Sequence, residues 1–153
     1  MSRRSFSFLR RFSKGNEGVA LVELAVVLNV FLLLVLGTVE FGYLYYMKHV
    51  ITNASREGAR YGVVWRARAD GSRMPPKELN PSIVTVTNNY LTKVLPTGTY
   101  NVTVTNNTGY TTGGKGQDLI VTVTGHKNWS ALGGFIPKVK NLTITAQTDM
   151  KCE

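Results

Sequence analysis

The carboxylate of Glu23 lies inside a long apolar stretch of the sequence. Residues 19–39 read VALVELAVVLNVFLLLVLGTV, and only Glu23 and Asn29 interrupt them strongly. A charged carboxylate in lipid is costly unless it is paired or lies near the interface. If the chain were cut between Gly18 and Val19, Val19 would carry a new ammonium and Glu23 would become the fifth residue. That ammonium could pair with Glu23 of a neighbouring copy or relative and fix the axial register of the two helices.

The apolar stretch has the length and character of a membrane span. About 20 mostly apolar residues cross a bilayer, and a helix in lipid is apolar on all sides. Five basic residues and one acidic residue precede it within residues 1–18, which therefore carry +4 of the net charge of +9 of the 153-residue chain. The positive-inside rule then predicts a cytoplasmic N-terminus and an extracytoplasmic C-terminal part.

Two simpler membrane segments fit this stretch less well. A secretory signal peptide has a shorter apolar core and ends at small residues, whereas this stretch runs into Glu40-Phe41-Gly42-Tyr43. A plain signal anchor would have no need of Glu23.

The residues around the possible cut resemble a known processing site. The stretch GVALVE, residues 18–23, resembles the type IV prepilin site: a basic leader, a glycine, then a hydrophobic helix with glutamate at mature position five. More closely, residues 15–42 resemble the start of TadE-like proteins, which are minor pilin-like subunits of tight-adherence (Tad) pilus systems. Asn29 departs from that pattern, and the resemblance extends over about residues 15–62. The positions that carry it are Gly18, Ala20, Val22, Glu23, Ala25 and Glu40.

The resemblance implies a role and a set of partners. A prepilin peptidase would remove residues 1–18 by cutting between Gly18 and Val19, so this chain would be a substrate and not an enzyme. Glu23 would set the register of the helix in a homo- or hetero-oligomeric filament of pilin-like subunits. The chain would insert in the bacterial inner membrane, work with the pilus assembly platform, and serve adhesion or secretion, with the pilus at the cell surface.

The helix is predicted to continue beyond the membrane through residues 40–65. That segment contains no proline, and one helix over residues 19–65 would be roughly 70 Å long. Its apolar or small residues recur in steps of three or four, which indicates one buried helical face. These residues are Tyr43, Met47, Val50, Ala54, Gly58, Tyr61 and Trp65.

Charged residues on this second half have two interpretations. Arg56, Glu57 and Arg60 lie in a segment that resembles the Arg-Glu-Ala-Ala-Arg stretch of TadE-like proteins. They form either a solvated charged face or a contact surface for another subunit. Gly58 and Gly62 form a small-residue pair, which outside lipid is weak support for helix pairing.

The C-terminal part is predicted to be a small α+β domain. Residues 66–81 read as a linker, and Asn80-Pro81 as the N-cap and first residue of a short helix that ends before Pro96. The Val/Thr alternation at residues 83–87 also fits a strand. Three later stretches alternate apolar and polar residues, which predicts a three-stranded antiparallel sheet within residues 82–153. These stretches are residues 100–105, 119–123 and 142–150.

Residues typical of enzymes and metal sites do not form recognisable patterns. His49 and His126 have no ligand-spaced neighbours, so the sequence predicts no metal, no cofactor and no catalysis. The basic residues do not gather on one stripe outside the leader, which argues against nucleic-acid binding. The lone Cys152 is either a free thiol or half of an intermolecular bridge. The alternative function is an uncleaved, membrane-anchored extracytoplasmic module that binds a ligand or acts as a scaffold.

Overall fold

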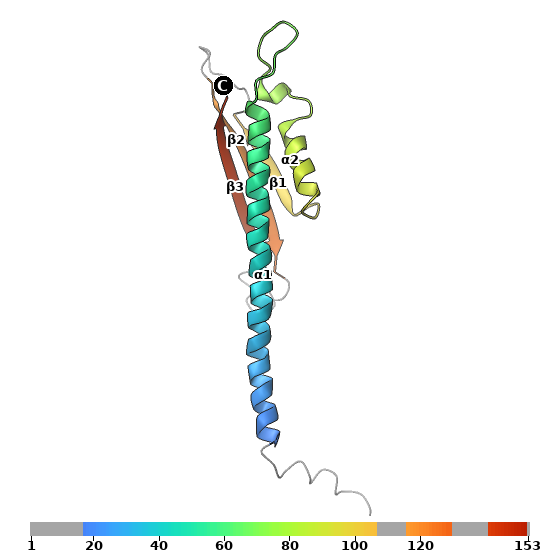
Figure 1. Ribbon diagram of the computed structural model, residues 1–153, viewed down its shortest axis with the longest axis vertical. Coiled ribbons are helices and arrows are strands. Elements are labelled where there is room, and N and C mark those ends of the chain that lie inside the picture. The colour runs from blue at the N-terminus through green and yellow to red at the C-terminus, as the bar shows by residue number, and fades with distance from the viewer. Residues whose placement is uncertain (1–16, 107–115, 130–140, 153) are drawn as a thin grey trace, which may run out of the picture. The chain divides into compact units, whose positions relative to one another are not determined.

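The computed structural model describes residues 17–106, 116–129 and 141–152. The elements follow in the order α1 (Glu17–Val63), the 3-10 helix η1 (Pro76–Glu78), α2 (Ile83–Thr92), β1 (Tyr100–Thr105), β2 (Asp118–Asn128) and β3 (Asn141–Lys151) (Figure 1). The predicted α+β class is confirmed: a long apolar helix, a short helix and a three-stranded antiparallel sheet. The chain divides between Val39 and Glu40 into two compact units.

The first unit contains the start of α1, where apolar side chains are exposed on every side. Val19, Leu24 and Phe31 are 70%, 59% and 57% exposed. By length and composition, α1 can cross a membrane from Gly18 onward. Exposed apolar groups in this number require lipid or other helices around them, so this helix is a candidate membrane anchor.

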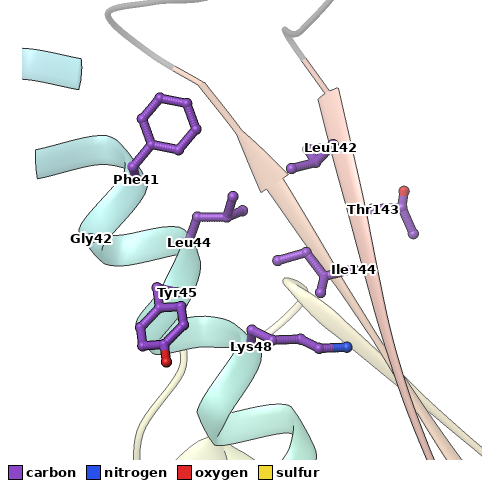
Figure 2. A pocket seen from close by; sticks show the side chains of 8 residues that line it. All are labelled: Phe41, Gly42, Leu44, Tyr45, Lys48, Leu142, Thr143 and Ile144. Carbon is purple, nitrogen blue, oxygen red and sulfur yellow. The ribbon is translucent and has the colours of Figure 1, made fainter. Parts of the chain in front are cut away.

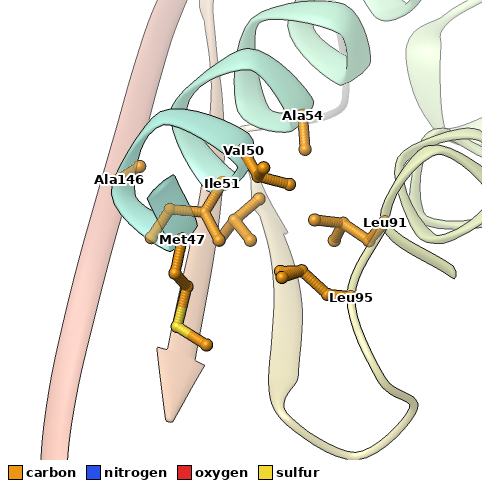
Figure 3. Packing of buried hydrophobic residues seen from close by; sticks show 8 residues of the cluster. Met47, Val50, Ile51, Ala54, Leu91, Leu95 and Ala146 are labelled. Atoms are coloured by element: carbon orange, nitrogen blue, oxygen red, sulfur yellow. The ribbon is translucent and has the colours of Figure 1, made fainter. Parts of the chain in front are cut away.

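The second unit is built around the later turns of α1. Met47, Val50, Ile51 and Ala54 are buried, and they pack with residues of α2 and the sheet (Figure 3). Three of these four belong to the predicted stripe. Their partners in this first cluster are Leu91, Leu95, Val123 and Ala146. A second cluster joins Ala59, Leu79, Ile83, Leu119, Val121 and Cys152.

The helix α1 ends at Val63, two residues before the predicted end. Arg73 donates to the Val63 carbonyl at 2.8 Å, and Arg66 donates to the Tyr61 carbonyl at 3.1 Å. These guanidinium groups satisfy carbonyls that the last turn of a helix leaves without partners. Trp65 therefore lies outside the helix and is 61% exposed, so it does not belong to the buried stripe.

The start of α2 corrects the predicted cap. Ser82, not Asn80, is the N-cap, and its hydroxyl accepts a hydrogen bond from the Thr85 amide at 3.2 Å. The helix consequently begins at Ile83, two residues after the predicted position, and the strand alternative for residues 83–87 is excluded.

The sheet has the order β1-β2-β3, with both pairs antiparallel. Val102 lies opposite Val123, which in turn lies opposite Ala146. Along β2 the buried residues alternate with partly exposed ones, because successive side chains of a strand point to opposite faces. One face of the sheet thus packs on α1 and α2, and the predicted alternation is confirmed.

Candidate functional site

The predicted cleavage point lies in the first turn of α1. Gly18 and Val19 are helical and exposed, and a Cβ placed on Gly18 would have no atom within 4 Å. No contact with the described part of the chain therefore restricts this position. The leader itself, up to residue 16, lies outside the described residues, and cleavage stays a prediction.

Glu23 differs from the other polar groups of the apolar segment. The Asn29 amide donates to the Ala25 carbonyl at 2.9 Å, and the Thr38 hydroxyl donates to the Leu34 carbonyl at 2.9 Å. Each of these groups thus donates one hydrogen bond within its own helix. Glu23 is exposed, and among the residues that the structure describes it has no hydrogen-bond or ion-pair partner. Of the polar side chains in this segment, Glu23 is therefore the one without a partner in the described part of the chain.

The candidate subunit-contact residues lie on the solvent side of α1. Arg56, Glu57 and Arg60 are all exposed, whereas the neighbouring Ser55 and Ala59 are buried in the core. The fold thus leaves charges of both signs on one outer face of the helix. Whether another subunit binds there stays a prediction.

The small-residue pair on α1, Gly58 and Gly62, has a packing role within the chain itself. A Cβ on Gly58 would overlap the Thr87 hydroxyl of α2, and one on Gly62 would lie 2.7 Å from Ile83 Cδ1. Real Cβ atoms do not approach that closely, so these glycines let α2 and the sheet pack against α1. The pair is therefore occupied by the domain's own core and is not a free helix-pairing surface.

Within the second unit, a groove that the sequence did not reveal opens between residues 41–48 of α1 and the start of β3. We call it the α1–β3 groove; it has a volume of about 740 Å³, and Phe41, Leu44, Tyr45 and Lys48 line its α1 side. Leu142 and Ile144 extend from β3 toward the helix (Figure 2). The walls are almost entirely apolar, and the Lys48 ammonium donates to the Thr145 carbonyl at 2.6 Å.

Aromatic contacts hold the α1 side of this region in place. The Phe41 ring meets the buried Trp129 ring edge to face, with centroids 5.0 Å apart. The Lys127 ammonium lies 4.5 Å from the centroid of the Tyr43 ring. Four aromatic residues lie between Phe41 and Tyr46, but the residues that they meet lie roughly 80–100 positions later in the chain, so this local pattern did not reveal the groove.

The remaining chemically active side chains do not form a cluster. His126 lies near Thr143, and His49 packs against the Tyr45 ring. Cys152 is buried, and burial raises the pKa of its thiol. In the described ranges, no three His, Cys, Asp or Glu side chains are arranged to hold a metal ion.

Comparison with known proteins found a family match, and it lies within α1. Residues 18–60 match the family model described as TadE-like protein. The predicted resemblance is thereby confirmed over nearly the whole of α1. No curated protein and no solved structure matches the chain.

Proposed function

We propose that this chain is a structural subunit of a Tad-type type IV pilus assembly and that it joins the filament through α1. The match over residues 18–60 supports the association with the pilus. The observation that carries the proposal is Glu23, a carboxylate without a described partner on an apolar helix whose Asn29 and Thr38 side chains each donate to a carbonyl of the same helix. Such a group is expensive in lipid, so a partner that neutralises it favours assembly.

The partner proposed for Glu23 is the ammonium of a processed neighbour. A prepilin peptidase cuts between Gly18 and Val19, which leaves a positive charge at the start of the mature helix. Glu23 of one subunit then pairs with Val19 of an adjacent subunit or relative. Pairing compensates both charges for the loss of water and holds the two helices at one axial offset. Glu23 thus both drives association and sets register.

The remaining surfaces are assigned from charge and exposure. The basic leader stays in the cytoplasm, residues 19–39 cross the inner membrane, and residues 40–153 fold on the extracytoplasmic side. Arg56, Glu57 and Arg60 contact a neighbouring subunit or the assembly platform, which their exposure and mixed charge support. The chain performs no catalysis itself and needs no cofactor.

The N-terminus of the mature protein tests this proposal. Mass spectrometry of the full chain from cells with a prepilin peptidase is expected to find Val19 as the first residue, and from cells without it, Met1. Met1 in both cases, or a cut beyond Val39, would contradict the proposal. The first of these results would favour the uncleaved, membrane-anchored binding or scaffold module.

A further inference from the structure

We infer that the α1–β3 groove holds an acyl chain of an anionic phospholipid, with the lipid's phosphate near Lys48. The inference rests on one part of the proposed function, the membrane insertion of residues 19–39. It is independent of leader cleavage and of filament assembly.

The position of the groove along the chain brings it to the lipid. Phe41 follows Val39, the last residue of the predicted span, by two positions in the same helix. From Phe41 to Lys48 the helix rises about 10 Å, so the groove is long enough to cross the roughly 5–7 Å headgroup layer of one leaflet and to extend a few ångströms beyond it. Phospholipid is thus the apolar molecule available to the groove at the highest local concentration.

The chemistry of the lining matches a hydrocarbon chain. Leu44, Leu142 and Ile144 face the space between the helix and β3 (Figure 2). Phe41 and Tyr45 at its edge are 59% and 68% exposed, although both are large aromatic side chains. Aromatic rings of this kind are enriched where membrane proteins cross the headgroup layer. An acyl chain would cover this apolar surface, which water covers poorly.

The charge at one end of the groove favours an anionic headgroup. Lys48 is the charged residue of the lining. Its hydrogen bond to Thr145 uses one of three ammonium donors, so two others can reach a phosphate oxygen. A zwitterionic lipid would bring a second positive charge to the same place, so phosphatidylglycerol is preferred over phosphatidylcholine.

Two glycines of α1 provide a matched pair of variants. Gly42 lines the groove and Gly37 lies within the predicted span, and a Cβ on either would have no atom within 4 Å. Gly42→Phe would therefore fill the groove without displacing the core. Gly37→Phe adds the same side chain to the same helix outside the groove.

The experiment uses the full chain in mixed phosphatidylcholine and phosphatidylglycerol vesicles, with native mass spectrometry of the lipids that stay bound. The wild-type chain is expected to retain phosphatidylglycerol in several-fold preference. Gly42→Phe should lower that retention several-fold, and Gly37→Phe should not. Lys48→Gln should abolish the headgroup preference. Equal retention by Gly42→Phe and wild type, or no preference in the wild type, would overturn the inference.

A photoactivatable acyl chain gives a second readout that needs no variant. Phosphatidylglycerol with a diazirine in its tail should label the peptide that contains Leu142 and Ile144. Labelling confined to residues 19–39, or a groove residue cross-linked to another copy of the chain, would contradict lipid binding. Flotation with the vesicles tests the premise separately, because a chain that fails to float refutes membrane insertion and with it the inference.

Discussion

Gly58 of α1 and Thr87 of α2 lie so close that a Cβ on the glycine would overlap the threonine hydroxyl. Thr87 is fully buried, and its hydroxyl donates to the Ile83 carbonyl at 2.8 Å, so it has little freedom to turn away. One helical turn later, Gly62 lies against Ile83 and Leu119 in the same manner. The approach of α2 and β2 to α1 thus depends on two positions without side chains.

Replacement of Gly58 by alanine should destabilise the folded domain. Overpacking of a filled core costs about 1–3 kcal/mol, which outweighs the roughly 1 kcal/mol that alanine gains over glycine in a helix. Chemical denaturation of the full chain in detergent micelles measures the effect.

Gly42→Ala is the control for Gly58→Ala. It makes the same change in the same helix, where a new Cβ meets nothing, and should be neutral or slightly stabilising. Combining Gly58→Ala with Thr87→Ala should recover part of the loss, because the second change removes the overlapping hydroxyl. Equal stability of the two single glycine variants would show that the close packing is not limiting.

Replacement of Glu23 by glutamine should block filament incorporation but not membrane insertion. Glutamine keeps the size of the side chain and removes the charge that pairs with a neighbouring ammonium. Asn29→Ala removes a polar but uncharged group from the same segment, one that already donates to Ala25 in its own helix, so assembly should continue. The amounts of each variant in sheared filaments and in membranes measure the two steps. Normal incorporation of the Glu23 variant would refute the pairing.

Replacement of Gly18 by phenylalanine should leave the leader attached. The peptidase must bring the bond between Gly18 and Val19 into its active site, and a bulky side chain obstructs that approach. Gly37→Phe makes the same change elsewhere in α1 and should mature normally. Immunoblots for the size of the chain in producing cells report both results, and maturation of the Gly18 variant at the wild-type rate would count against this cleavage point.

Cys152 should react slowly with maleimide while the chain is folded. It is 2% exposed, and burial raises the pKa of its thiol above the ordinary value of 9.0. As the pH rises past that value, the unfolded chain loses the thiol proton before the folded chain does. Stability should therefore fall with rising pH, and Cys152→Ala should reduce that dependence. Ready formation of a disulfide-linked dimer by the folded chain would contradict this burial.

Most of the fold could be predicted because its signals are local. The alternation of Val and Thr at residues 100–105 marks a strand from the side-chain period alone. Met47, Val50 and Ala54 mark the buried face of α1 from their spacing. The family resemblance was also local, since it rests on one continuous stretch that matches over residues 18–60.

The errors and omissions arose where distant residues decide the outcome. Asn80 and Ser82 are both good N-cap residues, and only the packed structure selects Ser82. The end of α1 depends on Arg73, which reaches back ten residues to Val63. The α1–β3 groove brings Tyr45 and Ile144 together from opposite ends of the second unit, so no local pattern could reveal it.

The pairing of Glu23 with a neighbouring Val19 can be tested most directly by zero-length cross-linking in filaments. A membrane-permeant carbodiimide joins a carboxylate to an amine in contact with it. Filaments assembled from mixed light and ¹⁵N-labelled subunits should yield a peptide that joins the Val19 α-amine of one isotope to Glu23 of the other. Chains that still begin at Met1 within the filament, or links between Val19 and Glu23 of the same isotope only, would contradict the account.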